Sequence, residues 1–321
     1  MAKAFAYVGN ETVGSMVEER LGALGYVRTG DVGSASAVLS YCTSQTALED
    51  AYFDEDGLVQ AARKGTLLID LSPSTPSFAR ELNAVAVVSD LVSVEAPLVV
   101  VDIARADAFD RGNLVCLAAG DEDALESARP VLEALAGEVQ DTGGSGSAQL
   151  ARAAYTLQAT AQVASAVEAD ALYRAVRRSA SAFGQDVERV GAATPTAERV
   201  LDAVKGGRFD GDYTVEMFMA ELSAALTAAD DVDLILPQAE ACLHLLELLA
   251  VIGGSDKAPS ALALVYGEEA VCAEQGLDWT RAEEAYGEAD EGFDDYDFDE
   301  HDGHDHGGYS DYPGYGAYSV N

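Results

Sequence analysis

The sequence predicts an α/β protein in which a doubly wound, parallel sheet precedes an all-helical half. Two observations predict this class. Short apolar runs alternate with amphipathic runs up to about residue 146, and long helical periodicity replaces that alternation from residue 147. With 321 residues, the chain is long enough for two domains with their own cores. We assign residues 1–146 to the α/β domain, 147–281 to the helical domain and 282–321 to a tail.

The first half supplies the strands of the predicted sheet. An apolar run at 4–8 stops at Gly9, and apolar residues with helical spacing follow over 13–24. Further strands are expected at 26–29, 37–42, 66–70, 84–88, 97–102 and 114–118. Helices are expected over a stretch ending near residue 62 and over 76–82. The run 66–70 is almost wholly apolar, which is typical of a central parallel strand.

The second half is expected to contain only helices, at 148–178, 187–204, 215–229, 237–251 and 258–275. The first of these carries only Arg152 and Glu168 as charged residues before Asp170. We therefore expect it to be buried on most of its sides. After about residue 281 the composition turns to Asp, Glu, Gly, Tyr and His without an apolar period, which predicts a flexible tail.

The net charge of −37 limits the partners of the chain, because it repels nucleic acids and anionic membrane surfaces. Thirteen acidic residues and no Lys or Arg follow residue 281, but the rest of the chain still has 43 acidic and 19 basic residues.

No window holds 18 uninterrupted apolar residues, and the N-terminus has no signal-peptide core. The four cysteines are far apart, which predicts buried thiols: Cys42, Cys116, Cys242 and Cys272. We expect a cytoplasmic protein.

The turn after the first strand holds a degraded dinucleotide-binding motif. In G-x-G-x-x-G the first glycine allows the tight turn, the second lets the backbone approach a diphosphate and the third packs the helix on the strand. Here the second glycine is Glu11, which costs space and adds charge repulsion toward an anion. The helix N-terminus is still expected to offer free N–H groups. The predicted cofactor residues are Gly9, Asn10, Glu11, Thr12, Val13 and Gly14. Alternatively, the two remaining glycines serve only the turn.

An acidic residue about 20 positions after the motif would bind a ribose hydroxyl, whereas an arginine there would accept a 2′-phosphate. Asp31 lies 22 positions after Gly9, and Arg28 precedes it closely. Both residues are candidates, so the choice between NAD and NADP stays open.

Several segments together resemble the β-hydroxyacid dehydrogenases, meaning 3-hydroxyisobutyrate dehydrogenase and its relatives, with 6-phosphogluconate dehydrogenase more distant. The segments are Ala37-Val38-Leu39-Ser40, Asp56-Gly57-Leu58, the run from Gly65 to Ser72, Ala96-Pro97, Gly120-Asp121-Glu122, Arg129-Pro130-Val131-Leu132 and Gly144-Ser145-Gly146. The resemblance spans roughly residues 4–275. It implies a Rossmann-like domain that binds NAD or NADP, with Thr43 and Ser72 among the cofactor contacts. It also implies a long interdomain helix and a homodimer.

The family resemblance further implies hydride transfer at a hydroxyl carbon, with a lysine on the long helix as acid and base. That lysine falls on Leu150, and its amide partner falls on Ala153 or Ala154. Leu150 cannot exchange a proton. Arg152 lies about 200° around the helix from Leu150 and is expected to point away from the cleft side. Tyr155, roughly 140° away, is a candidate proton donor, although a packing role is the simpler interpretation.

Other parts of the implied site also differ. The Ser-Gly-Gly loop that would hold a carboxylate aligns with Val99-Val100-Val101, and a Lys-Asp pair aligns with Ala220-Glu221. The segment between Gly25 and Ala37 is short, which suggests that a helix and a strand have been deleted. No catalytic residue is therefore assigned.

The tail concentrates three of the four histidines among carboxylates, at His301, His304 and His306. Imidazole and carboxylate ligands suit Zn, Ni or Cu, so the three are candidates for weak metal binding. Its tyrosines are candidate contacts for a partner protein. The sequence leaves two hypotheses for the whole chain. One is an NAD(P)-dependent oxidoreductase with altered substrate or chemistry, and the other is a catalytically inactive dimeric scaffold or regulatory protein.

Overall fold

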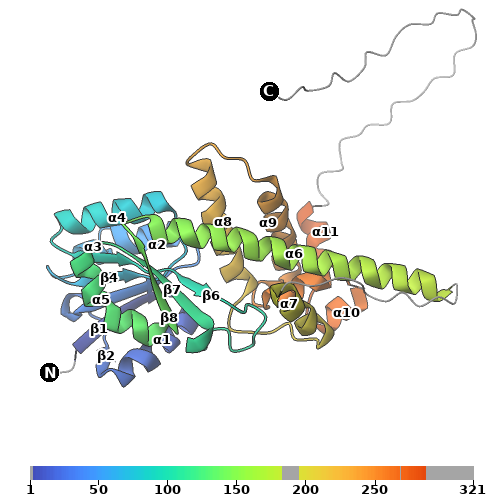
Figure 1. Cartoon of the computed structure of the whole chain (residues 1–321), viewed down its shortest axis with the longest axis horizontal. Helices are drawn as coiled ribbons and strands as arrows, with labels where there is room; N and C mark the ends of the chain where they lie inside the picture. The colour runs from blue at the N-terminus through green and yellow to red at the C-terminus, as the bar shows by residue number, and fades with distance from the viewer. Residues whose placement is uncertain (1–2, 183–194, 268, 287–321) are drawn as a thin grey trace, which may run out of the picture.

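A mixed eight-stranded sheet forms the centre of the first half (Figure 1). The computed structural model describes residues 3–182, 195–267 and 269–286. The strand order is β2-β1-β3-β4-β5-β7-β6, with β8 paired to β7. The first five strands of this order are parallel, as predicted, whereas β7 is antiparallel to β5 and β6. The strands are β1 Lys3–Gly9, β2 Tyr26–Arg28, β3 Ala37–Tyr41, β4 Leu67–Asp70, β5 Val92–Glu95, β6 Leu98–Val100, β7 Leu114–Ala119 and β8 Glu138–Gly143.

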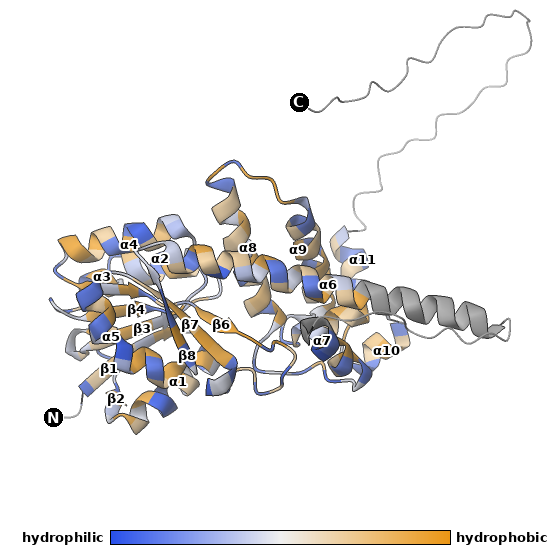
Figure 2. Ribbon diagram, viewed as in Figure 1, coloured by the Kyte–Doolittle hydropathy of each residue, from blue (hydrophilic) through white to orange (hydrophobic). Residues whose placement is uncertain are grey.

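Helices cover both faces of this sheet, because successive strand side chains point to opposite faces. Phe5 joins the core cluster under one set of helices, whereas the next residue, Ala6, joins the cluster under the other. Figure 2 shows the resulting apolar strands between amphipathic helices. One face is covered by α1 (Glu11–Ala23) and α5 (Glu122–Leu135), and the other by α2 (Gln45–Phe53), α3 (Leu58–Ala61) and α4 (Pro76–Val88).

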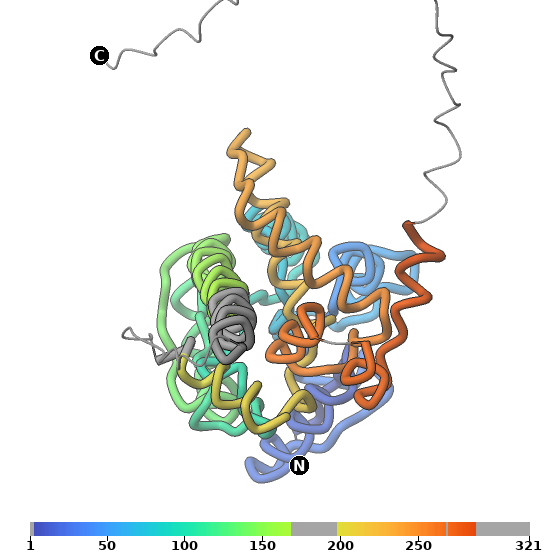
Figure 3. The backbone as a smooth tube through the Cα atoms, turned by 90° about the vertical axis from the view of Figure 1, so that its right-hand side faces the viewer, coloured from blue at the N-terminus to red at the C-terminus, as the bar shows by residue number. Residues whose placement is uncertain are grey.

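The helix α6 (Ser147–Ala182) links the two halves. It packs against β7 and β8 at its start and then against the helices of the second half. Figure 3 views α6 nearly end-on beside those helices. They are α7 Pro195–Lys205, α8 Val215–Asp230, α9 Pro237–Leu249, α10 Glu269–Glu274 and α11 Thr280–Tyr286. Among the described residues no single helix meets the length and apolarity needed to cross a membrane, although the bent pair Pro237–Gly254 and Pro259–Tyr266 meets both jointly.

Two predicted elements differ from the structure. Residues 84–88, predicted as a strand for their β-branched content, form the end of α4, where Val87 and Val88 are exposed. The strand of this region is β5, which follows α4. The segment 258–275 is not one helix, because a 3₁₀ helix, Pro259–Tyr266, ends at Gly267 before α10.

The short segment between α1 and β3 keeps its strand. The strand β2 pairs in parallel with β1, and only a 3₁₀ turn, Val32–Ser34, stands between β2 and β3. Because β2 is the edge of the sheet and the chain goes from it directly to β3 on the other side of β1, the strand that lies outside the second strand in the usual order 3-2-1-4-5-6 is missing from the described residues. This agrees with the predicted deletion of one helix and one strand.

The helix α6 is buried on most of its sides over residues 147–167, as predicted. Leu150 and the exposed residues at 151, 154, 158 and 165 leave one side open to solvent. Its buried side includes Gln149, Arg152 and Thr156. All four cysteines are buried and unbridged, as predicted.

Candidate functional site

The carboxyl ends of β1 and β3 define the candidate site. In the order β2-β1-β3-β4, the chain leaves β1 toward one edge and resumes at β3 on the other side of β1. Ligands of open α/β sheets bind at such a switch point. The strands meet closely here, because the N–H of Asn10 donates to the carbonyl of Tyr41 at 2.8 Å. Gly9 has φ +120°, and a Cβ on it would lie 2.0 Å from that same carbonyl oxygen. The contact between the strands thus requires a glycine at position 9.

The first turn of α1 is capped by its own chain. The side-chain oxygen of Asn10 accepts from the N–H groups of Thr12 at 3.0 Å and Val13 at 3.3 Å. The prediction that the N-terminus leaves these groups free is therefore wrong. Gly14 allows close helix–strand packing, since a Cβ there would lie 2.7 Å from the Tyr7 ring.

Glu11 reaches across from α1 to the end of β2. Its carboxylate accepts from Arg28 at 2.9 and 3.2 Å, and this bond lowers the pKa of Glu11. Arg28 also pairs with Glu18 at 3.2 Å and lies over the Tyr7 ring, 5.4 Å from its centroid. The predicted cofactor residues Glu11 and Arg28 are thus brought together. The negative charge at the second glycine position is compensated within the chain.

This turn fits a dinucleotide diphosphate once the Asn10 side chain turns away. The N–H groups of Thr12 and Val13 converge on one acceptor, the Asn10 oxygen, as they would on a phosphate oxygen. Losing such a cap costs about 1 kcal/mol. A diphosphate at this turn would therefore have to displace the Asn10 cap, which a turn without such a cap would not require.

Asp31, the candidate ribose contact, lies on the exposed turn after β2. One of its oxygens accepts from the N–H of Gly33 at 3.0 Å, which caps the 3₁₀ turn. Arg28, the candidate for a 2′-phosphate, is engaged by two glutamates. The structure therefore does not favour either form of the cofactor.

Thr43 and Ser72 lie at the ends of β3 and β4 in different environments. The Thr43 hydroxyl donates to Glu216 of α8 at 3.3 Å, across the boundary between the two halves. Ser72 is fully buried, and its hydroxyl accepts from the N–H of Cys42 at 3.0 Å. Its carbonyl accepts from the Gln149 amide at 3.0 Å. Thr43 therefore borders the space between the halves, and Ser72 ties β4 to α6.

A cleft of about 290 Å³ lies between these strand ends and α8. Its polar lining consists mainly of hydroxyl groups, together with Gln45 and the carboxylate of Glu216. Ser77 of α4 donates to Asp231 just past α8, which is a second hydrogen bond between the two halves. The residues lining the cleft are Thr43, Ser44, Gln45, Pro73, Glu216, Met219, Ala220, Ser223, Ala224, Thr227, Ala250 and Ser255.

Two buried carboxyl groups lie opposite each other at the ends of β4 and β5. Asp70 and Glu95 are partners in the parallel register. Asp70 accepts from the Ser40 hydroxyl at 2.9 Å, and burial raises its pKa to about 6. Glu95 accepts from the N–H groups of Gly146 at 2.5 Å and Ala148 at 3.3 Å, and burial raises its pKa to about 7. Glu95 therefore anchors the start of α6 to the sheet. Sequence reasoning missed both acids, although each ends an apolar strand.

Comparison with known proteins agrees with this architecture. Residues 10–144 match the NAD binding domain of 6-phosphogluconate dehydrogenase. The chain is 28% identical to 2-hydroxy-3-oxopropionate reductase of Escherichia coli, over 82% of this chain and 89% of that protein. It is 29% identical to the NAD-dependent L-serine dehydrogenase of Pseudomonas aeruginosa, over 70% and 77%. A structure of Mycobacterium tuberculosis 3-hydroxyisobutyrate dehydrogenase with L-serine superimposes with a TM-score of 0.62 at 21% identity, over 84% of this chain and 100% of that one.

This chain is a distant relative of the β-hydroxyacid dehydrogenases. The resemblance noted from the sequence is thereby confirmed, and so is the succession of a Rossmann-like domain and a helical domain. The next residues to locate are those at positions to which the resemblance assigns a chemical role.

The position to which the sequence resemblance assigns a lysine lies on the open side of α6, and the opposite side of the helix is buried. Leu150 is 61% exposed, whereas Arg152 is 2% exposed and forms a 2.8 Å ion pair with Glu221 of α8. Glu221 also accepts from the Thr156 hydroxyl at 3.2 Å. Arg152 and Leu150 thus occupy different sides of α6, but the prediction that Arg152 points away from the cleft side is wrong. Arg152 contacts α8, which lines the cleft, whereas Leu150 is open to solvent and is not among the cleft residues.

The remaining candidates are structural in their contacts. The Tyr155 hydroxyl donates to the Val100 carbonyl at 2.9 Å, and burial raises its pKa to about 12. A proton donor with that pKa is poorly matched to neutral pH. Val99 and Val100 are buried in β6, where the family would have its substrate loop.

The predicted metal ligands His301, His304 and His306 lie outside the described residues. Within the part of the chain that the structure describes, no group of three or more His, Cys, Asp or Glu side chains is arranged to hold a metal ion.

Proposed function

We propose that this protein is an NAD(P)-binding oxidoreductase whose reaction differs from the hydroxyacid chemistry of its relatives. The observation that carries the proposal is which residues stand at two positions of α6. Leucine stands where the family resemblance implies a lysine, and the nearest cation on the helix, Arg152, is held by Glu221. A leucine side chain cannot hold or deliver a proton. A different group must therefore handle the proton of any hydride transfer.

The dinucleotide would lie along the carboxyl ends of β1 and β3. The N–H groups of Thr12 and Val13 would bind its diphosphate after Asn10 turns away, and Arg28 would offset the charge of Glu11. When bound, the nicotinamide would donate a hydride to a substrate carbon or accept one from it. Thr43 and Glu216 border the adjoining cleft, where hydroxyl-bearing walls orient a small substrate. The named activities of the relatives, a reductase and an NAD-dependent dehydrogenase, support this reaction class.

Direct titration with NADH and NADPH, followed by nicotinamide fluorescence and calorimetry, tests the proposal. We expect a dissociation constant in the micromolar range for at least one of them. Absence of binding at millimolar concentration of both would overturn the proposal.

Glu11→Gln provides a sharper version of this titration. Removing the carboxylate relieves its repulsion toward the diphosphate and releases Arg28 from one of its two ion pairs, so the affinity should rise modestly, because the charge is exposed and screened by solvent. The gain should shrink in high salt. Glu19→Gln, an exposed change on the same helix, is the matched control and should leave the affinity unchanged. Equal affinities in all three proteins would show that the first turn does not contact the diphosphate.

A second candidate is a regulatory protein that binds the dinucleotide without turnover. The self-capped first turn and Leu150 favour it. Micromolar NADPH binding without NADPH consumption over a panel of aldehydes, ketones and imines would support this candidate over the enzyme.

We further propose a homodimer, because the open side of α6 is available for a second copy. Light scattering after size exclusion measures it, and a monomeric mass at micromolar concentration would refute it.

A further inference from the structure

The cleft beside α8 is acidic, and this distinguishes it from a site for carboxylate substrates. Its lining, drawn from the described residues, contains one charged side chain, the carboxylate of Glu216, and no Lys, Arg or His. The exposed Glu216 accepts from the Thr43 hydroxyl at 3.3 Å and keeps further acceptor capacity. A carboxylate ligand would meet this charge without a compensating cation.

The cations near the cleft are committed elsewhere. Arg152 is buried and paired with Glu221 of α8 at 2.8 Å. Lys257 follows the cleft residue Ser255 closely in the chain, but its ammonium group pairs with Asp210 at 2.8 Å. Neither can receive a ligand carboxylate without breaking its own ion pair.

A second acceptor lies in the same wall. The Gln45 amide nitrogen donates to Glu49 at 2.8 Å, which fixes the orientation of the amide, because a carboxylate accepts only from a donor. The amide oxygen of Gln45 is buried and has no hydrogen-bond partner among the described residues. Gln45 and Glu216 both line the cleft, where the Glu216 carboxylate is the exposed acceptor. The Gln45 oxygen is itself buried, so it would accept from a ligand only after the amide moves.

We propose that the cleft binds a small substrate through an amino group and that it disfavours substrates with a free carboxylate. An ammonium group has three donors and a positive charge, which match Glu216, Gln45 and the surrounding hydroxyls. The strongly acidic surface also raises the local concentration of small cations. This inference rests on the proposed function, because it names the substrate class of the same cleft.

Three probes of equal size test this preference: n-butylammonium chloride, sodium butyrate and n-butanol. Their binding to the full chain is measured by ligand-detected NMR and calorimetry, with and without saturating NADPH. We expect n-butylammonium to bind at least tenfold more tightly than butyrate, and n-butanol to lie between them. Butyrate binding as tightly as the amine would overturn the proposal.

Removing the charge of Glu216 tests whether the preference for the amine arises in the cleft. Glu216→Gln should reduce the ratio between amine and butyrate affinities to below about threefold, and Glu240→Gln, an exposed change on α9, should leave the ratio intact. A preference that survives Glu216→Gln would refute the cleft as its source. The NADPH titration in the same samples separates the two proposals. NADPH binding without an amine preference refutes only the substrate class, whereas an amine preference without NADPH or NADH binding refutes only the oxidoreductase.

Discussion

The buried ion pair between Arg152 and Glu221 should be a main determinant of how α6 and α8 pack. Their side chains are 2% and 6% exposed, and the nitrogen–oxygen distance is 2.8 Å. Replacing one partner leaves the other charge buried and uncompensated, which costs about 3–5 kcal/mol. Glu221→Gln keeps the shape of the side chain and an acceptor for Thr156, so it isolates the loss of charge. We expect it to lower the free energy of unfolding by about 3 kcal/mol.

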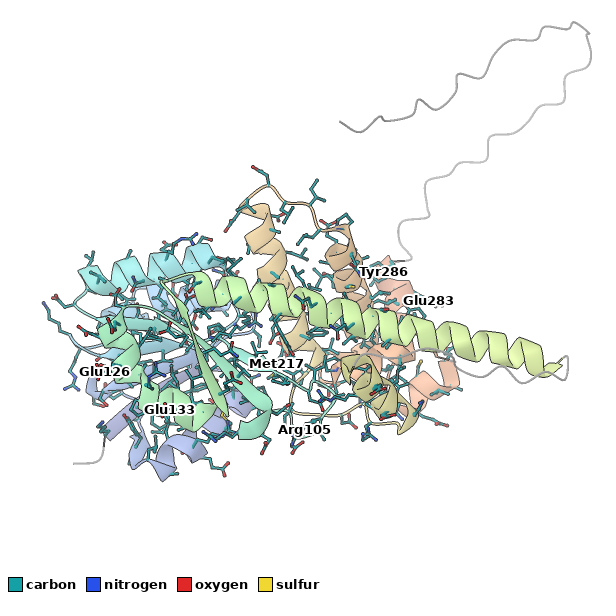
Figure 4. All side chains as sticks on the ribbon, in the orientation of Figure 1. Arg105, Glu126, Glu133, Met217, Glu283 and Tyr286 are labelled. Carbon is teal, nitrogen blue, oxygen red and sulfur yellow. The ribbon has the colours of Figure 1, made fainter. Side chains whose placement is uncertain are left out.

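Urea unfolding followed by circular dichroism measures this cost in a double-mutant cycle. Arg152→Met alone should cost as much as Glu221→Gln, and the double variant should cost less than the sum by about 3 kcal/mol, because no charge is then left unpaired. The surface pair of Arg105, labelled in Figure 4, and Asp107 is the control, with side chains 38% and 67% exposed. Its cycle should give a far smaller coupling than the buried pair, because water screens exposed charges. Single costs below about 1 kcal/mol at the buried pair would refute the reasoning.

Three further outcomes are expected. Burial raises the pKa of Glu95 from 4.5 to about 7, so the folded chain binds an extra proton between these values. Stability should therefore fall by about 3 kcal/mol as pH rises from 4.5 to 7, and Glu95→Gln, compared by urea unfolding at each pH, should remove that slope. Gly14→Ala should lower the thermal midpoint, because the new methyl meets the Tyr7 ring, whereas Gly22→Ala on the same helix meets nothing within 4 Å and should raise it. Tyr155→Phe should cost about 1 kcal/mol in urea for its lost hydrogen bond to β6 and leave turnover unchanged; a loss of turnover would make it a catalytic group.

The strands of the parallel core could be predicted from the sequence because they are buried on both faces and read as continuous apolar runs. The exception, residues 84–88, shows the limit of such runs. Val87 and Val88 are 59% and 86% exposed, whereas the buried residues of α4 follow helical spacing: Phe78, Ala79, Leu82 and Ala86. Helical spacing of the buried residues, together with the Thr75 cap, outweighed β propensity there.

The sequence predicted where the first turn of the site lies, but it did not predict the side-chain contacts there. Sequence placed Glu11 and Arg28 in one region but could not show that they pair across the end of β2, since that depends on a parallel strand contact. The acids Asp70 and Glu95 were hidden by their apolar strands, and only the register sets them opposite each other. The cap by Asn10 has a local signal, because asparagine before a helix is a preferred cap.

The three motif positions of the first turn do not carry equal information about a ligand. Gly9 is required by the carbonyl of Tyr41, and Gly14 by the ring of Tyr7, whether or not a dinucleotide binds. Only position 11 is free of such a demand, because its side chain extends outward to Arg28 with 69% of it exposed. A chain that keeps the fold but changes its ligand therefore retains the outer glycines and changes the middle one. It follows that affinity for NADPH should respond to substitution at position 11 while stability does not, and that stability should respond at position 14. The opposite pattern would mean that Glu11 and Arg28 serve the fold.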